Sequence, residues 1–195
     1  MPITIDGDGT ISGISVGGLP DGIVDADMIA ADAVTAAKVG FKGFTSYAVI
    51  CDQKAQDTDG GTFTDGAWRT RDLNTEIMDP DSIVSISSNQ FTLSSAGTYY
   101  IEAYAPSFGC NSNVARLYNV TDSSVAQYGS HSYSRSSSGD LGDSKAFVHA
   151  RVTLTGSTTF EIQHRCDNSR TTNGFGVGAN LSVEIYTVVK IYKEA

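Results

Sequence analysis

From Phe44 onward, apolar and polar residues alternate with a period of two, which is the pattern of strands that have one buried and one exposed face. Clusters of Gly, Asp, Asn and Ser separate the alternating segments at the spacing expected of a β-sandwich. The predicted strands are 46–51, 82–87, 98–105, 113–120, 145–154, 158–164 and 181–192. The pattern therefore predicts an all-β fold, in which residues 41–195 form one head of jelly-roll size.

The residues before this head follow two other patterns. Residues 1–24 alternate Ile and Val with Gly, Asp, Ser and Thr, and such a short segment cannot bury enough apolar surface by itself. We expect it to be a thin, extended attachment segment that borrows a partner chain. Residues 25–40 are rich in Ala, with Asp25 or Asp27 as a possible N-cap and Gly40 as a stop. This segment predicts a helix over 26–39, too short to be stable alone, and hence a trimerising stalk.

One stretch of the head resembles a known family. In Phe91-Thr-Leu-Ser-Ser-Ala-Gly97-Thr-Tyr99-Tyr-Ile101-Glu-Ala103, an aromatic residue is followed by Gly-x-Tyr-x-apolar. This resembles the central signature of the trimeric heads of the complement first component and the tumour necrosis factor superfamily, with Ile101 and Ala103 where that family has aromatic residues. The runs ARLYNVTD and VEIYTVVKIYKEA resemble its next strand with its turn and its closing strand. The resemblance implies a trimeric jelly roll whose aromatic sheet faces meet at a threefold axis.

A second resemblance covers the whole chain. The segments ITIDGDGTISG, GGLPDGIVDADMIAADAVTAAKVG, ARLYNVTD, FEIQHRCDNSRTTNGFGV and VVKIYKEA together resemble short tail-fibre proteins of tailed bacteriophages and prophages. This implies a homotrimeric virion fibre, synthesised in the host cytoplasm, whose residues 1–40 contact other virion proteins. Its head would contact a host-surface glycan or protein. Two alternatives stay open: a host-polysaccharide hydrolase, and a head-fibre or decoration trimer with no receptor role.

Two long polar loops are candidates for receptor binding. If the last strand pairs antiparallel with the first, as the resemblance implies, the loops 52–66 and 167–178 share the end of the head away from the stalk. Their polar groups suit sugar hydroxyls and their aromatic rings suit stacking on a sugar, unless the rings point into the core. The candidates are Asp57, Asp59, Phe63, Asn168, Arg170, Asn173 and Phe175.

A third polar stretch, 129–143, is expected to be a loop. Tyr128, His131, Tyr133 and Arg135 lie in or beside it among small residues. Tyr with Ser is a composition typical of adaptable recognition surfaces, and it is equally typical of a flexible hairpin tip. Both interpretations of this stretch stay open.

Charge and composition exclude several classes of partner. The formal net charge is −9, which argues against nucleic acid because phosphate binding needs clustered cations. No run of about 20 apolar residues occurs, so we expect no membrane insertion. The N-terminus lacks the parts of a signal peptide, which predicts synthesis in the cytoplasm. Cys51, Cys110 and Cys166 are expected to be buried thiols in a reducing compartment.

The sequence offers no catalytic motif. HExxH and SxxK are absent, and the three His residues lie apart. His164 and Cys166 share one face of a strand, but no orienting group is identifiable. We therefore expect no enzyme, no cofactor and no metal site; calcium in the acidic loop 52–65 is the minor alternative to a solvated loop. A hydrolase would need two carboxylates that face one groove. Trp68, the only tryptophan, is expected to be a core or interface anchor.

Overall fold

The computed structural model describes residues 4–5, 11–12, 43–137 and 140–195. The chain divides into two compact units, Met1–Phe41 and Lys42–Ala195. In the first unit, β1 (Thr4–Ile5) pairs antiparallel with β2 (Ile11–Ser12). The helix expected over 26–39 lies outside the described residues.

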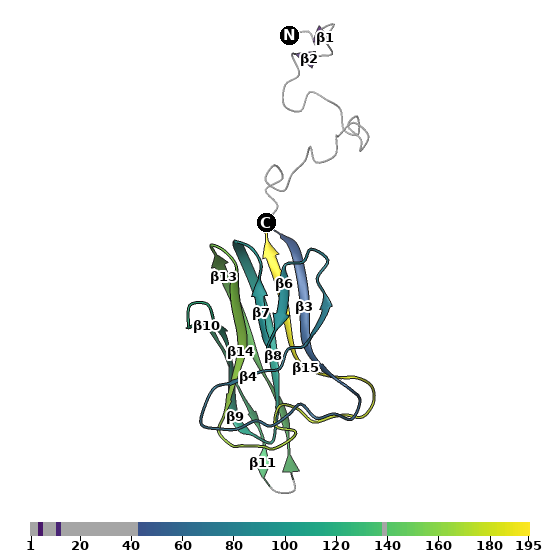
Figure 1. Cartoon of the computed structure of the whole chain (residues 1–195), viewed down its shortest axis with the longest axis vertical. Coiled ribbons are helices and arrows are strands. Elements are labelled where there is room, and N and C mark those ends of the chain that lie inside the picture. Colours follow the sequence, from purple (N-terminus) through teal and green to yellow (C-terminus); the bar gives the residue numbers. More distant parts are fainter. Residues whose placement is uncertain (1–3, 6–10, 13–42, 138–139) are drawn as a thin grey trace. The chain divides into compact units, whose positions relative to one another are not determined.

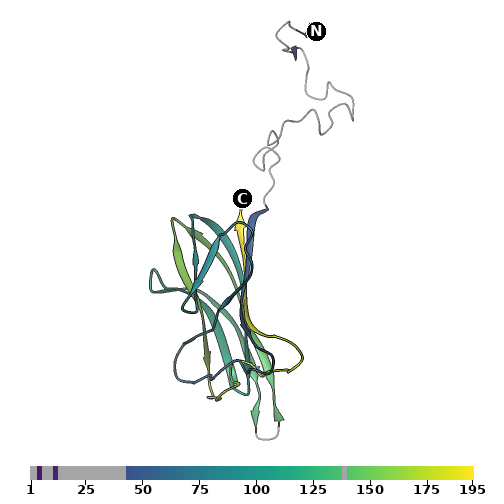
Figure 2. The same cartoon turned by 45° about the vertical axis from the view of Figure 1, so that its right-hand side comes forward.

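The second unit is a sandwich of two antiparallel sheets, as Figures 1 and 2 show from two sides. The first sheet has the order β13-β8-β15-β3-β5 and consists of β13 (Asp143–Leu154), β8 (Gly97–Phe108), β15 (Glu184–Glu194), β3 (Phe44–Lys54) and β5 (Thr75–Met78). The second has the order β10-β9-β14-β7-β6 and consists of β10 (Ser124–Ser134), β9 (Asn111–Asn119), β14 (Thr158–Cys166), β7 (Gln90–Leu93) and β6 (Val84–Ser87). The short strands β4 (Arg69–Thr70), β11 (Ser136–Ser137) and β12 (Asp140–Leu141) complete the described part, with β4 paired to β14 and β11 to β12. The predicted jelly-roll fold is confirmed.

The core lies between the two sheets because alternate residues of each strand face inward. In β8, Tyr99, Ile101 and Ala103 are buried and the residues between them are partly exposed. The hydroxyl of the buried Tyr99 donates a hydrogen bond to the carbonyl oxygen of Ser95, 2.9 Å away. Gly97 has a φ of +146°, and a Cβ there would lie 3.0 Å from the side chain of Lys193. Glycine is therefore required at position 97, where β8 begins, and this accounts for the glycine of the Gly-x-Tyr signature.

All seven predicted strands are present, but the predicted loop at 129–143 is wrong. Residues 124–134 form β10, an edge strand that pairs with β9 through two register shifts. A Cβ on Gly129 would lie 2.2 Å from the carbonyl oxygen of Phe147, so this position needs glycine where β10 crosses close to β13. Glycine, serine and bulges suit such an edge strand, and in sequence they look like a loop.

The first and last strands of the head pair antiparallel, as expected. The amide of Ala195 donates to the carbonyl of Gly43, 3.0 Å away, so both ends of this unit lie at the same end of the sandwich. The loops 55–66 and 167–178 lie at the opposite end, the lower one in Figure 1. They are joined by two bridges, Gly61 with Asn173 and Phe63 with Arg170. Among the described residues, no helix could span a membrane.

Candidate functional site

An exposed row of aromatic side chains covers the outer side of the first sheet. Strand register places Tyr47, Tyr192 and Tyr100 side by side, and Phe147 directly across from Tyr104. Phe147 is 44% exposed and Tyr47 is 42% exposed in the single chain. We call this surface the aromatic face, and it consists of Phe44, Tyr47, Tyr100, Tyr104, Phe147 and Tyr192. Its rings contact one another, with Phe44 and Tyr192 centred 4.9 Å apart.

The outer side of the first sheet also carries charged groups, and several of them are paired within the chain. Arg151 donates to the carboxylate of Glu194 through two bonds of 2.7 Å. The Nδ1 of His149 lies 3.7 Å from the carboxylate of Glu102. Between these groups is a hollow of about 130 Å³ lined mainly by apolar atoms of Ala103, Tyr104, Phe147 and Val188. Another surface can therefore cover these paired groups without leaving their charges unpaired.

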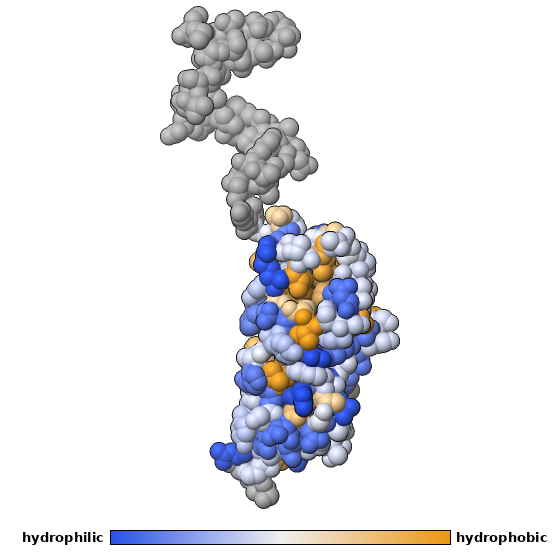
Figure 3. Space-filling model, turned by 90° about the vertical axis from the view of Figure 1, so that its left-hand side faces the viewer, coloured by the Kyte–Doolittle hydropathy of each residue, from blue (hydrophilic) through white to orange (hydrophobic). Residues whose placement is uncertain are grey.

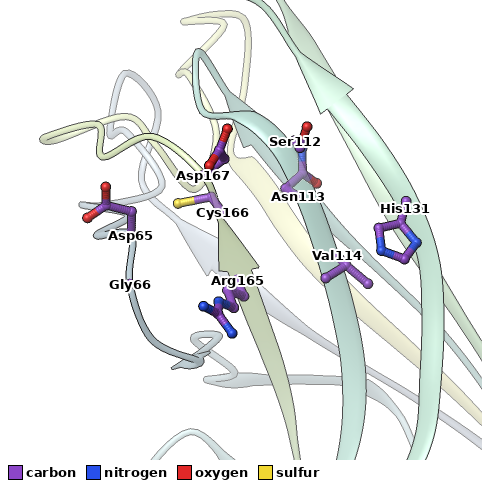
Figure 4. Close-up of a pocket in the computed structure, with 9 residues that line it drawn as sticks. All are labelled: Asp65, Gly66, Ser112, Asn113, Val114, His131, Arg165, Cys166 and Asp167. Atoms are coloured by element: carbon purple, nitrogen blue, oxygen red, sulfur yellow. The ribbon is translucent and has the colours of Figure 1, made fainter.

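A polar groove of about 510 Å³ lies on the outer side of the second sheet, next to the 55–66 loop that follows β3. It is lined by Asp65, Gly66, Ser112, Asn113, Val114, His131, Arg165, Cys166 and Asp167. Figure 4 shows that the lining residues come from separate segments, with Asp65 on its loop, His131 on β10 and Arg165 on β14. The lining brings carboxylates, a guanidinium, an imidazole and a hydroxyl together from separate parts of the chain.

Hydrogen bonds fix the walls of the polar groove. The hydroxyl of Ser169 accepts from the amide of Asp65 at 3.0 Å and donates to its carboxylate at 2.9 Å. The amide of Asp167 donates to the carbonyl of Ser112 at 2.9 Å. The two loops pack so closely that a Cβ on Gly174 would lie 2.6 Å from the Cβ of Phe63. The groove is therefore pre-formed by its backbone.

An aromatic cluster adjoins the polar groove on the same sheet. The guanidinium of Arg116 lies 3.9 Å from the ring centre of Trp68 and 5.1 Å from that of Tyr118, and its Nε donates to Gln163 at 2.7 Å. Tyr128, which is 58% exposed, lies 6.2 Å from Trp68 between ring centres. Arg116 is two residues from the groove residue Val114 on the same face of β9. We call Trp68, Arg116, Tyr118 and Tyr128 the Trp68 stack. Trp68 is thus a partly exposed anchor outside the core.

Two of the predicted binding residues are not available to a ligand. Phe63 and Phe175 are buried, and their rings lie 4.8 Å apart in a small core with Cys110 and Cys166. The prediction that they stack on a sugar is wrong; they anchor the two loops to the sandwich, because an apolar ring in a glycine-rich loop gains more by burial than by exposure.

The polar candidates in these loops mainly hold the loops together. Arg170 donates to Asn173 at 3.0 Å, Asp59 accepts from the amide of Gly178 at 2.9 Å, and Asn168 donates to the carbonyl of Gly109 at 3.5 Å. Asp57 is exposed at a positive φ of 60°. The candidates Tyr128 and Tyr133 are exposed on β10. Among the described residues, no three acidic, His or Cys side chains are grouped to hold a metal ion.

The side of the head where β10 and β13 lie carries a further hollow, of about 390 Å³. Ala126, Val152, Leu154 and Phe160 supply its apolar lining, and Thr and Ser residues of two hairpins supply the rest. Figure 3 faces this side and shows apolar side chains gathered in its upper and middle part. The hollow has no charged group besides Asp122, which sets it apart from the polar groove.

The fold buries Arg71 completely between the loops and the sheets. Its guanidinium donates to Thr187 Oγ1 at 2.8 Å, to the carbonyl of Pro106 at 3.1 Å and to the carbonyl of Phe175 at 2.8 Å. Burial lowers the pKa of this guanidinium to about 9. The side chain thus connects β15, β8 and the 167–178 loop below the groove.

His164 is buried under the groove and is the basis of a pH prediction. Its Nε2 lies 3.0 Å from Asn113 Oδ1, its Nδ1 has no partner, and its ring packs 4.6 Å from that of Phe63. Burial, and then the charge of Arg71, hold the pKa of this imidazole well below its ordinary value. Below about pH 6.5 the unfolded chain therefore binds a proton that the folded chain does not bind, and stability decreases as the pH is lowered.

We expect His164→Gln to flatten this dependence. As the pH is lowered from 6.5 to 5, this residue should reduce the free energy of unfolding of the wild type by up to about 1.4 kcal/mol per pH unit. The variant should not show this reduction. Urea unfolding at several pH values measures both slopes. His131→Gln, which changes an exposed imidazole, is the matched control and should keep the wild-type slope. Equal slopes for His164→Gln and the wild type would contradict the assignment.

Comparison with known proteins supports the fold. No protein-family model and no curated protein sequence matches the chain. Among solved structures, the globular domain of the zebrafish complement 1qA protein aligns with a TM-score of 0.49 and 14% identity over 76% of this chain and 97% of that domain. The crystal structure of murine APRIL at pH 5.0 aligns with a TM-score of 0.50 and 5% identity over 76% of this chain and 98% of that one. The likeness to APRIL shows a shared jelly-roll fold, and no catalytic family is indicated.

Proposed function

We propose that the head is a homotrimer whose subunits meet through the aromatic face. The observation that carries this proposal is that one sheet surface exposes several large rings, beside which the charges of Arg151 and Glu194 are paired within the chain. A monomer that left such a surface in water would lose the stabilisation that its burial provides. The resemblance of the Gly97-x-Tyr99 stretch to trimeric heads supports the same arrangement.

The trimer is, in this proposal, the non-enzymatic head of a virion fibre that contacts the host surface. The polar groove and the Trp68 stack would bind a surface glycan, since hydroxyls of a sugar edge suit Asp65, Arg165 and Asp167 and an apolar sugar face suits exposed rings. Residues 1–40 would attach the head to other virion proteins. The groove supports a receptor role over that of a decoration trimer, and threefold repetition raises avidity without new contacts.

A hydrolase is the second candidate, because the groove brings two carboxylates, Asp65 and Asp167, to one site. Both are exposed, whereas a glycosidase normally buries the carboxyl group that serves as its acid. Binding without turnover is therefore the stronger proposal. The hydrolase would be favoured if the wild type released reducing ends from a bound polysaccharide and the variants Asp65→Asn and Asp167→Asn did not.

The test of the binding proposal is retention on immobilised bacterial surface polysaccharides. The double variant Tyr128→Ala/Asp167→Ala should weaken binding about tenfold or more, because it removes one exposed ring and one acceptor from the site. Leu181→Ala/Asp81→Ala removes one exposed apolar side chain and one exposed carboxylate elsewhere, and should bind like the wild type. Equal weakening in both variants, or in neither, would count against the groove as the binding site.

A further inference from the structure

Cys110 and Cys166 lie at adjoining positions although 56 residues separate them in sequence. Cys110 is in the turn between β8 and β9, and Cys166 is the last residue of β14, which pairs with β9. Beyond the paired strands, the amide of Asn168 donates to the carbonyl of Cys110 at 3.2 Å. The two backbone segments therefore run side by side at this point.

The two thiols meet inside a small apolar core. Both cysteines are buried with Phe63 and Phe175 in one small cluster, and the side chain of each shifts the pKa of the other. The sulfur of Cys110 lies 3.1 Å from the carbonyl oxygen of Phe108 and 3.6 Å from that of Gly174, and the sulfur of Cys166 lies 3.4 Å from that of Asn168. Cys51 lies apart from this pair, on β3 of the other sheet.

We propose that Cys110 and Cys166 form a redox-active pair that closes to a disulfide bond on exposure to a small disulfide oxidant such as oxidised glutathione. Cys166 lines the polar groove, which gives the oxidant a way in. Figure 4 shows its sulfur directed from the end of β14 toward the loop that carries Asp65. Cys110 is fully buried and Cys166 is 6% exposed, so Cys166 is the thiol nearer to solvent. This proposal does not depend on what the groove binds.

The reaction is thiol–disulfide exchange in two steps. The thiolate of Cys166 attacks one sulfur of the oxidant, which forms a mixed disulfide and releases one oxidant thiolate. The thiolate of Cys110 then attacks the Cys166 sulfur, which forms the Cys110–Cys166 bond and releases the second. The two cysteines lose two electrons and two protons in total, and the oxidant is reduced to two thiols.

The proximity of the two thiols favours the attack of Cys110 on Cys166 and slows the attack of Cys166 on the oxidant. The neighbouring Cys166 side chain lowers the pKa of Cys110, so Cys110 is the more readily ionised thiol and the better resolving nucleophile. The same contact, together with burial, raises the pKa of Cys166. We therefore expect slow closure that accelerates with rising pH.

The disulfide bond would link the edge of the polar groove covalently to the turn between β8 and β9. It would link the β8–β9 turn to the start of the 167–178 loop, which supplies Asp167 to the groove. It would also close a long chain loop and so restrict the unfolded state. The oxidised head should melt about 10 °C above the reduced head.

The experiment incubates the full chain with oxidised glutathione at pH 8 and compares it with a sample kept in reducing agent. Mass spectrometry should find two thiols lost, one thiol left, and one peptide pair joined through Cys110 and Cys166. Cys166→Ser should retain a free Cys110 and show no oxidation-dependent rise in melting temperature. Cys51→Ser is the matched control and should oxidise like the wild type.

Two results would overturn the proposal. One is a wild type that keeps three reactive thiols after prolonged oxidation. The other is a disulfide that includes Cys51 or joins two chains. Because both readouts are made on the wild type, they decide the matter even if Cys166→Ser fails to fold.

Discussion

The double variant Tyr47→Glu/Phe147→Glu is expected to separate the trimer into single chains at micromolar concentration. Both side chains are more than 40% exposed in the single chain, so the substitutions cost the fold of one subunit little. In a trimer they would place six carboxylates in an apolar interface, and an unpaired buried charge costs several kcal/mol. Light scattering should therefore give about one third of the wild-type mass, and circular dichroism should keep its β signal.

The matched control for this effect is Tyr133→Glu/Leu181→Glu. It introduces the same charges at two exposed apolar positions outside the aromatic face. It should keep the wild-type mass, because neither position takes part in the proposed contact. If both double variants dissociate, net charge and not the aromatic face would control assembly.

Replacement of Arg71 by Met is expected to have the largest effect on stability, about 3 kcal/mol of unfolding free energy. The substitution removes three hydrogen bonds and leaves the carbonyls of Pro106 and Phe175 and the hydroxyl of Thr187 buried without that donor. Removal of a buried cation from its partners also outweighs the apolar contacts that Met restores. Chemical unfolding measures the loss.

Arg69→Met is the matched control for Arg71. Arg69 is exposed two residues earlier and donates only to the carbonyls of Thr64 and Asp65, at 3.2 and 3.5 Å. Its replacement should cost less than about 0.5 kcal/mol. An Arg71→Met head as stable as the control would show that the three acceptors find other donors and that Arg71 does not hold the loops to the sheets.

The strands of the head could be predicted from sequence because their alternation is local. β8, β9, β13 and β14 each bury every second residue, so period two marks them directly. β10 does not show this alternation in its sequence, because it has only one neighbour in its sheet and its bulges shift the register. The pairing of β15 with β3 followed from the family resemblance and is confirmed.

The site was harder to predict because it depends on contacts distant in sequence. Asp65, His131 and Arg165 come from three separate segments, and only the packing of the loops brings them to one groove. One local signal was present: in the run from His164 to Asp167, alternation places Arg165 and Asp167 on the face opposite His164 and Cys166. The aromatic residues Phe63 and Phe175 carried a misleading signal, since polar neighbours in a loop do not determine whether a ring is buried.

If three copies of this head assemble through the aromatic face, as proposed, the full chain in solution has the mass of a trimer. Light scattering coupled to size exclusion at micromolar concentration should give three times the chain mass of 20.6 kDa. A mass of one chain under these conditions would contradict the proposed trimer, because the exposed rings would then have no partner surface.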